Sequence, residues 1–457
     1  MTITSAIAEL GTVLGDRLTT SKSELDLHGQ NETHFAHMPP DAVLYPETTA
    51  EVSTALAICH RHDCPVIPWG TGTSLEGHAL AVNGGVTIDL SRMSRVLQIN
   101  TDDMDAVVQP GITREALNTE LRATGLFFPI DPGANASIGG MASTRASGTT
   151  AVRYGTMREN VLALEVVLAD GRVIRTGTRA RKSSAGYDLT AMFVGAEGTL
   201  GLITELTLRL HGQPEAVSAA ICVFDDIDTA VATVIATIQM GIPMAPIEFV
   251  DEATARAFNI YADAKMPEKP HLLLEFHGSD QAVSEQAERV GEIVADMGGH
   301  DFQWTTKAED RNALWKMRHN AYYATLALKP GATAVVTDVC VPISRLADAV
   351  RETRADILAS GLPGPILGHV GDGNFHAILL IEPGNAAEKR LALDLSHRLA
   401  NRALAMGGTV TGEHGVGMGK LDYMVAEHGE GWTVMGDIKR ALDPKGIMNP
   451  GKLVRTN

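Results

Sequence analysis

The fold is decided by the stretch Cys64-Pro65-Val66-Ile67-Pro68-Trp69-Gly70-Thr71-Gly72-Thr73-Ser74. Its apolar first half predicts a short strand after a helix over residues 50–62, and its small residues 70–74 predict a turn. A turn without bulky side chains lets backbone amides approach a bound anion. Leu75 stands where GxGxxG has its third glycine, and no acidic residue closes a βαβ unit, so a Rossmann nicotinamide site is disfavoured.

Two further segments rich in small residues lie at 137–140 and 195–201. Any one of the three segments is most simply a tight turn. Three of them in one half of the chain favour a dinucleotide that lies across several loops. Residues 415–420 fail as a P-loop, because His414 stands at the first glycine position and Leu421 replaces the Ser/Thr.

Length and composition predict two or three domains of an ordinary soluble globular protein, since the chain has 457 residues, 44% hydrophobic and 20% charged. The net charge of −17 argues against nucleic acid and against an anionic membrane as partners. The sequence contains no apolar run long enough to span a bilayer, and residues 1–20 do not read as a targeting peptide. Four scattered cysteines favour reduced thiols without an iron–sulfur cluster, so we expect a cytoplasmic protein, with peripheral membrane attachment left open.

Short strands are predicted up to about residue 210, including a hairpin at Asp170-Gly171, with a helix over residues 113–124. Beyond residue 213 apolar strands alternate with longer amphipathic helices, which predicts an α+β domain with a sheet covered by helices. Residues 333–342 are expected to form one strand. Helices are expected from residues 226, 284, 308 and 344 and over residues 385–406.

The richest chemistry lies in Gly368-His369-Val370-Gly371-Asp372-Gly373-Asn374-Phe375-His376. If Asp372-Gly373 is a two-residue hairpin loop, His369 lies opposite His376, close enough for both imidazoles to bind one metal ion. Glu413 and His414 follow in a second glycine-rich segment and add a carboxylate and a third imidazole. Two histidines and one carboxylate make a divalent-metal set with open positions, although a histidine in such a loop is more often only hydrogen-bonded.

Taken together, these motifs resemble FAD enzymes with the vanillyl-alcohol oxidase/p-cresol methylhydroxylase fold. The resemblance covers roughly residues 45–453 and is strongest to the D-2-hydroxyacid dehydrogenase group, in particular to its D-lactate type. Within this group are also the flavoprotein subunit of glycolate oxidase and D-2-hydroxyglutarate dehydrogenase. The motifs that carry it, besides the two histidine segments, are Pro68–Ala79, Ala136–Ala142, Ala146–Gly148, Val152–Met157, Gly195–Gly201 and Asn449–Lys452.

The resemblance implies an α+β fold with an N-terminal helical segment at 1–35 and a two-subdomain FAD-binding domain at 36–213. A substrate and metal-binding cap domain at 214–457 would have an antiparallel sheet covered by helices, and its C-terminal segment would return to the flavin. Arg145 departs from the family pattern, and His78 is not at the position of covalent flavin attachment, so FAD should be bound without a covalent link. The implied cofactor-binding residues are Pro68, Gly70, Thr71, Gly72, Thr73, Ser74, Pro132, Gly133, Ser137, Gly139, Gly140, Ser143, Gly148, Glu197, Gly198, Ile203 and Asn449.

The resemblance also implies oxidation of a D-2-hydroxy acid to the 2-keto acid, with hydride transfer to N5 of the flavin. Arg318 matches the family's carboxylate clamp, with Trp315 on the same helical face and Asn374 as a further substrate contact. The implied metal ligands are His369, His376 and Glu413, which suit zinc or manganese, and His414 is the candidate base.

Several alternatives remain open at this point. The acid could be D-lactate, glycolate or D-2-hydroxyglutarate. An ether-lipid synthase type would use FAD without net oxidation, and a non-catalytic flavin-binding subunit would lack the metal set. Because the chain carries no nicotinamide motif and no cluster cysteines, we expect an external cytochrome, quinone or electron-transfer flavoprotein as acceptor. A homodimer is left open by the sequence.

Overall fold

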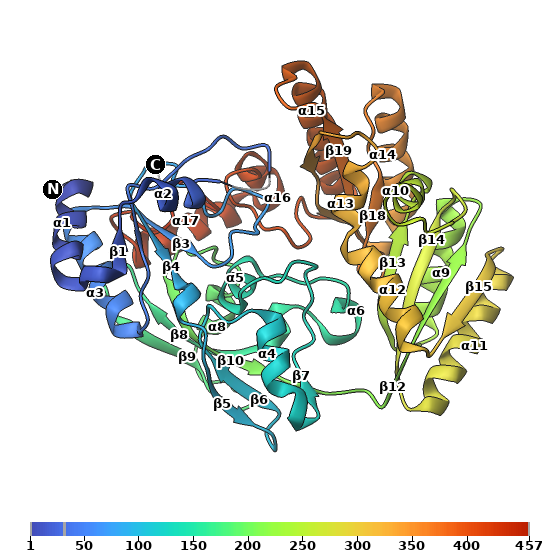
Figure 1. Cartoon of the computed structure of the whole chain (residues 1–457), viewed down its shortest axis with the longest axis horizontal. Coiled ribbons are helices and arrows are strands. Elements are labelled where there is room, and N and C mark those ends of the chain that lie inside the picture. The colour runs from blue at the N-terminus through green and yellow to red at the C-terminus, as the bar shows by residue number, and fades with distance from the viewer. Residues whose placement is uncertain (1, 31–32, 456–457) are drawn as a thin grey trace. The chain divides into compact units, whose positions relative to one another are not determined.

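The computed structural model describes residues 2–30 and 33–455. Residues 1 and 31–32 of the expected N-terminal segment therefore lie outside the described residues. The chain divides into two compact units, one made of residues 1–147, 155–213 and 413–457, and the other of residues 148–154 and 214–412 (Figure 1). We call them unit 1 and unit 2 and describe each by itself.

Unit 1 begins with a small sheet in the order β1-β2-β4-β3, in which β2, β3 and β4 run parallel. Helix α3 (Thr49–His62) precedes β3 (Val66–Trp69), as the sequence predicts. Its first turn is capped by the Thr48 side chain, which accepts from the amide of Glu51, and it ends where Asp63 takes a left-handed conformation. The other elements here are α1 (Ile3–Leu14), β1 (Leu18–Thr19), α2 (Lys22–His28), β2 (Ala42–Leu44) and β4 (Val86–Asp89).

The second sheet of unit 1 is antiparallel, with the order β5-β6-β10-β8-β9, and it includes the predicted hairpin around residues 170–171. Alternate residues of β10 (Leu202–Arg209) point into a core shared with α4 and α5. The remaining elements are β5 (Val96–Asn100), β6 (Asp105–Val108), α4 (Arg114–Leu121), β7 (Leu126–Phe127), α5 (Ile138–Thr144), α7 (Met157–Asn160), β8 (Val161–Val167), β9 (Val173–Gly177), α8 (Leu189–Phe193) and β11 (His211–Gly212).

The C-terminal segment folds back onto the N-terminal part of unit 1. Helices α16 (Met424–His428) and α17 (Glu430–Leu442) lie among the N-terminal elements in Figure 1. The amide of Val66 in β3 donates to the carbonyl of Ile447, and the buried Lys439 donates to the carbonyls of Thr199 and Met448, both at 2.7 Å. The last forty-five residues therefore complete the glycine-rich half of the protein.

Unit 2 is built on a sheet with the order β15-β12-β14-β13-β18-β19-β16, in which β17 also pairs with β19. All its paired strands are antiparallel, as predicted. The strands are β12 (Ala216–Val223), β13 (Met244–Val250), β14 (His271–Gly278), β15 (His300–Thr305), β16 (Thr333–Val336), β17 (Val339–Cys340), β18 (Ile366–Gly368) and β19 (Asn374–Ile381).

The two faces of this sheet have different covers. On one face Ile247, Phe249 and Phe375 pack with α9 (Ile227–Gln239), α11 (Asp280–Asp296), α14 (Leu346–Ser360) and α15 (Ala386–Ala405). On the other face Val250, Leu273 and Leu380 pack with α10 (Glu252–Ala262), α12 (Ala308–His319) and α13 (Ala321–Leu326). Because side chains alternate along a strand, Glu248 and His376 share this second face.

Residues 148–154 belong to unit 2 although both flanking segments belong to unit 1. Their short helix α6 (Ala151–Tyr154) packs on β13, where Arg153 donates to the carbonyl of Pro243 at 2.5 Å. The hydroxyl of Tyr154 lies 2.7 Å from Nδ1 of His277. This segment therefore packs on the sheet of unit 2 directly after a predicted flavin loop.

Most predicted elements of unit 2 are confirmed, with two corrections. The helix expected from Ser284 begins at Asp280, because the Ser279 side chain caps it by accepting from Ala282. The single strand expected over residues 333–342 is interrupted between Val336 and Val339.

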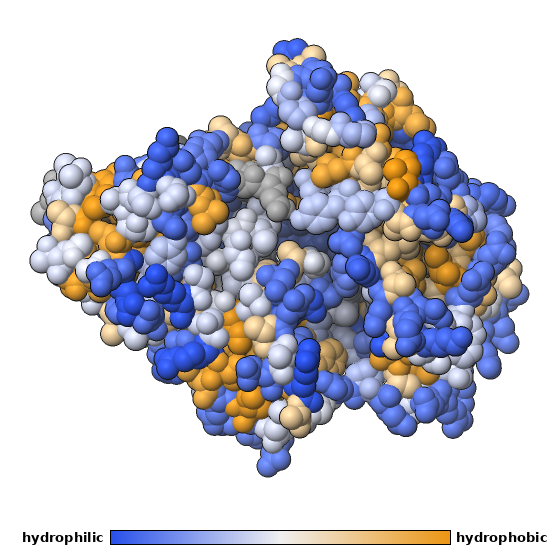
Figure 2. Space-filling model, in the orientation of Figure 1, coloured by the Kyte–Doolittle hydropathy of each residue, from blue (hydrophilic) through white to orange (hydrophobic). Residues whose placement is uncertain are grey.

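On the face shown in Figure 2, hydrophilic residues cover most of the surface and apolar residues occur in small groups between them. Within the described residues, none of the helices is both long and apolar enough to cross a membrane.

Candidate active site

Helix α12 carries the predicted carboxylate clamp. Arg318 is the one buried residue of this helix, with 8% of its surface exposed. An arginine in that position is unusual, since helices normally bury apolar side chains and arginines are mostly exposed. Trp315 lies one turn earlier and packs against the same core, and its buried Nε1 has no hydrogen-bond partner in the described chain.

A carboxylate that the sequence analysis did not single out holds Arg318. Glu248 on β13 is fully buried, and its Oε2 accepts from Nε of Arg318 at 2.8 Å and lies 2.6 Å from Nη2. Its other oxygen, Oε1, lies 2.6 Å from Nδ1 of His369. One carboxylate therefore joins the predicted substrate clamp to a predicted metal ligand. In the sequence, Glu248 could have been noticed as the single acid inside the apolar strand Met244–Val250.

The histidine hairpin forms, but in a different register from the one predicted. His376 pairs with Leu367 rather than with His369, so the loop spans residues 369–373 instead of two residues. The amide of Asn374 donates to the carbonyl of His369, which closes this wider turn. Gly373 takes a positive φ of 79°, and a Cβ there would lie 2.1 Å from the carbonyl oxygen of Val341. Close packing of Gly373 against the segment around Val341 therefore sets the shape of the turn. Local hairpin rules do not take such a contact into account.

The two imidazoles still come together as predicted. The ring centroids of His369 and His376 are 5.6 Å apart, the rings are nearly perpendicular, and both residues are buried. Each ring uses Nδ1 in a hydrogen bond, His369 to Glu248 and His376 to the carbonyl of Thr337 at 3.1 Å. Donation from Nδ1 places the lone pair of a neutral imidazole on Nε2, which is how metal-binding histidines are held by outer partners.

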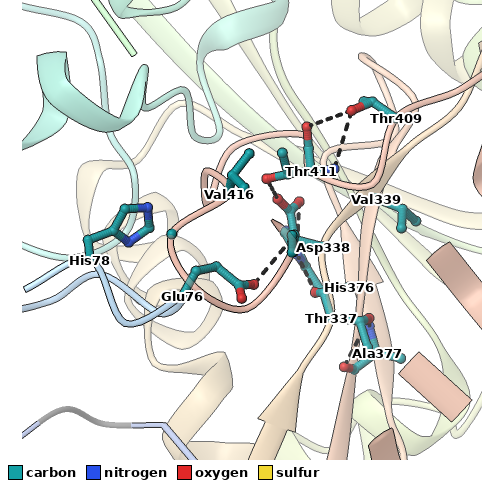
Figure 3. A network of polar contacts seen from close by, with 12 residues as sticks. Glu76, His78, Thr337, Asp338, Val339, His376, Ala377, Thr409, Thr411 and Val416 are labelled. Carbon is teal, nitrogen blue, oxygen red and sulfur yellow. Dashed lines mark hydrogen bonds and ion pairs between the residues drawn. The ribbon is translucent and has the colours of Figure 1, made fainter. Parts of the chain in front are cut away.

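Asp338 is a second buried acid that the sequence analysis did not identify. Strands β16 and β17 pair with β19 in one register, which places Asp338 opposite His376. Its Oδ2 accepts from the Thr411 hydroxyl at 2.8 Å (Figure 3). Its Oδ1 lies 3.6 Å from Nδ1 of His376 and accepts from Nδ2 of Asn374 at 2.7 Å. In the sequence, Asp338 could have been noticed as the acid that interrupts the predicted strand 333–342.

Asn374, predicted to touch substrate, has its amide nitrogen committed to Asp338 and to the carbonyl of Val339 at 2.8 Å. Its buried Oδ1 has no partner among the described residues. Gly412 packs directly on Asn374, because a Cβ at Gly412 would lie 2.1 Å from Nδ2. A substrate contact through Oδ1 stays a prediction.

The chain leaves unit 2 between Gly412 and Glu413, so Glu413 and His414 belong to unit 1. Within unit 1, Oε2 of Glu413 accepts from the Ser147 hydroxyl at 2.8 Å. The convergence of Glu413 with His369 and His376 stays a prediction.

Glu197 orders the loop that carries Glu413 and His414. Its carboxylate accepts from the amides of Val416 at 2.6 Å and Gly417 at 2.8 Å, and lies 3.2 Å from Nε2 of His78. Burial alone would raise the pKa of Glu197, but His78 and the two amides outweigh burial and lower it. Glu197, which was predicted to face FAD, thus binds the loop that carries Glu413 and His414. A contact between Glu197 and the flavin stays a prediction.

The three glycine-rich segments of unit 1 lie together, as predicted. A Cβ at Gly70 would lie 2.2 Å from Oγ of Ser137, and one at Gly198 would lie 2.2 Å from the Pro68 ring. Within the described chain, the amides of residues 71–74 donate no hydrogen bond to another residue. These consecutive donors fit the phosphates of a dinucleotide, so the loop fits FAD.

The other predicted cofactor residues occupy varied places in unit 1, apart from Gly148. Ser143 donates to the carbonyl of Gly139, which with Gly140 lies in α5, while Pro132 directly precedes a bend that begins at Gly133. Ile203 is buried in β10, and Gly148 is the first residue of the segment that enters unit 2. Their contacts with FAD stay predictions. The unexpected Arg145 donates to the carbonyl of Val194 and packs against Gly195.

Asn449 and Lys452 attach the C-terminal segment to these loops. The side chain of Asn449 donates to the carbonyls of His78 and Glu197 and accepts from Lys452. Lys452 is 1% exposed and also donates to the carbonyl of Leu80. Burial lowers the pKa of Lys452 to about 7, although the nearby Glu197 acts in the opposite direction.

This buried lysine predicts a rise of stability with pH. Between about pH 7 and the ordinary lysine pKa of 10.5, the unfolded chain holds a proton that the folded chain does not. The free energy of unfolding should therefore rise in that window, by up to about 1.4 kcal/mol per pH unit for this group. Lys452→Met should flatten the rise, as measured by urea unfolding at several pH values. An equal slope in the two proteins would contradict the prediction.

Comparisons with known proteins agree with this geometry. Residues 213–453 match the family model "FAD linked oxidases, C-terminal domain", and residues 40–177 match "FAD binding domain". A probable mitochondrial D-lactate dehydrogenase of Danio rerio is 48% identical over 98% of this chain and 91% of its own length. A mitochondrial D-lactate dehydrogenase [cytochrome] of Arabidopsis thaliana is 46% identical over 98% of this chain and 80% of its own length.

A solved structure of p-cresol methylhydroxylase with substrate bound superimposes with a TM-score of 0.80 at 19% identity, over 98% of this chain and 96% of that one. This likeness confirms the predicted α+β fold of the p-cresol methylhydroxylase type. With both family models matched in order along the sequence, the chain belongs to the FAD-linked oxidases.

Proposed function

We propose that the protein oxidises D-lactate to pyruvate with FAD as hydride acceptor and a divalent metal, zinc or manganese, beside the substrate. The observation that carries this proposal is the Glu248 carboxylate, which joins Arg318 to His369. It brings Arg318, a cation that can bind the substrate carboxylate, next to His369, an imidazole suited to bind a metal. The names of the relatives from Danio rerio and Arabidopsis thaliana support D-lactate over glycolate or D-2-hydroxyglutarate.

In this mechanism Arg318 binds and orients the substrate carboxylate. His369, His376 and Glu413 would hold the metal, which would supply Lewis acidity at the substrate hydroxyl. His414 takes the hydroxyl proton, for which an imidazole is suited near neutral pH. The amides of residues 71–74 would bind the FAD phosphates, and FAD would supply the hydride acceptor.

Anaerobic mixing with D-lactate tests the proposal. The oxidised flavin absorbance should be bleached, with one pyruvate formed per flavin reduced, and L-lactate should leave the spectrum unchanged. Metal analysis of the pure protein should find about one zinc or manganese per chain. Binding of D-lactate without bleaching would favour a non-redox enzyme of the ether-lipid synthase type. Faster bleaching by glycolate or D-2-hydroxyglutarate would reassign the substrate.

The electrons must then pass to an external acceptor. We propose a cytochrome, because the relative from Arabidopsis thaliana carries that word in its name and a net charge of −17 suits a basic partner. Reduction of a basic cytochrome c should weaken as salt rises, whereas a quinone acceptor would show little dependence on salt. A cytoplasmic location stays a proposal that rests on four free cysteines, and cell fractionation would test it.

A further inference from the structure

Glu248 is a buried acid whose two partners have different predicted roles. It is fully buried, and it lies on the sheet face covered by α10, α12 and α13. Both of its oxygens are used, Oε2 by Arg318 and Oε1 by His369. Its partners come from α12 and from the loop after β18. The carboxylate is thus the direct link between two side chains with different predicted roles.

Asp251, just beyond the end of the same strand, shows what a structural acid looks like here. It is 2% exposed, and its Oδ2 accepts from Nη1 of Arg354 at 2.6 Å. Its Oδ1 accepts from the amide of Thr254 at 2.7 Å and so caps α10. Both acids are buried and paired with an arginine, but the partners of Asp251 have no predicted part in the reaction.

The contacts of Glu248 restrict what its two partners can do. Nε and Nη2 of Arg318 share Oε2 of Glu248, while Nη1 makes no hydrogen bond within the described chain. A substrate carboxylate must therefore approach the edge formed by Nη1 and the outer hydrogen of Nη2. On the other side, an acceptor at Nδ1 of His369 fixes the tautomer whose lone pair is on Nε2.

We infer that Glu248 is a positioning residue that holds the carboxylate clamp and the metal-binding imidazole at one fixed spacing. This inference rests on the proposed function. A 2-hydroxy acid presents its carboxylate and its hydroxyl on adjacent carbons, so the groups that bind them must keep a constant separation. A single rigid carboxylate between Arg318 and His369 provides that separation without contacting the substrate.

Glu248→Gln tests this role, because it keeps the size of the side chain but leaves one oxygen to accept hydrogen bonds. Either Arg318 or His369 then faces an NH2 group and loses its partner. We expect the affinity for Zn²⁺ or Mn²⁺, measured by chelator competition, to fall about 10- to 100-fold. We also expect weaker binding of oxalate, followed by the flavin spectrum, a higher KM for D-lactate and a lower kcat. Glu248→Asp, which keeps both acceptors, should recover part of each loss.

Asp251→Asn is the matched control. It removes the charge of an equally buried, arginine-paired acid, so it should lower thermal stability while metal affinity, oxalate binding, KM and kcat per bound flavin stay at wild-type values. If Glu248→Gln behaves like this control, Glu248 is only structural and the inference is overturned. If Glu248→Gln does not fold, Glu248→Asp provides the test. The inference is overturned if this variant keeps the wild-type metal affinity, oxalate affinity, kcat and KM.

The two proposals fail in different ways. Wild-type protein that neither binds metal nor reduces its flavin with D-lactate would refute the proposed function before any variant is made. A wild-type enzyme that does both, with metal and oxalate affinities insensitive to Glu248, would refute only the inference. A double-mutant cycle gives a further test, since Glu248→Gln and Arg318→Lys should have clearly less than additive effects on oxalate affinity.

Discussion

His369→Ala should reduce kcat/KM for D-lactate by more than about 10³-fold, equivalent to about 4 kcal/mol of transition-state stabilisation, while FAD stays bound. The imidazole that Glu248 orients would be lost, and with it a proposed ligand of the metal. The flavin should remain because the loop amides of residues 71–74 and the segments packed around them all lie in unit 1. Steady-state kinetics with a dye acceptor, flavin absorbance and metal content measure the three expectations.

An exposed histidine of the same unit provides the control. His397 on α15 lies next to Asn401, and His397→Ala should leave turnover, flavin and metal content unchanged. Loss of flavin together with activity in His369→Ala would mean that the flavin and metal sites are not separate. Full activity in a metal-free His369→Ala protein would remove the metal from the reaction.

How far the sequence predicts this site is clearest in the histidine hairpin. The Asp-Gly signal predicts a turn between two strands and the proximity of two imidazoles, and both are present. The register is wrong by two residues, because the carbonyl of Val341 packs against Gly373 and the loop widens to five residues. Local turn preferences do not contain that contact between distant segments of the chain.

The two missed acids have a common physical cause. Glu248 and Asp338 each interrupt an otherwise apolar strand, and such a residue is ambiguous until its partner is known. Glu248 bonds to a helix 70 residues later and to a loop 121 residues later in the sequence. Pattern and spacing indicate the residues that are proposed to bind substrate or metal directly. The residues that orient them depend on tertiary contacts.

Arg318→Lys should lower kcat/KM for D-lactate about 100-fold, equivalent to about 2.7 kcal/mol, mainly through a higher KM. Lysine keeps the charge but replaces a planar fork with one ammonium group. In the native protein one edge of the guanidinium is used by Glu248, and the Nη1 edge is left for substrate. A single ammonium close to Glu248 would pair with it and could not offer a second, fixed edge to the substrate carboxylate.

Arg311→Lys is the control for this change, because Arg311 lies two turns earlier on α12 and, among the residues that the structure describes, donates only to the carbonyl of Val217. That single hydrogen bond can be kept by lysine, so KM and kcat should stay close to wild type. Competition by oxalate separates binding from chemistry, since its affinity should fall with Arg318→Lys by about the same factor as KM rises. Unchanged oxalate affinity with a lower kcat would show that Arg318 acts on the reaction without holding the carboxylate, and unchanged turnover would remove Arg318 from the site.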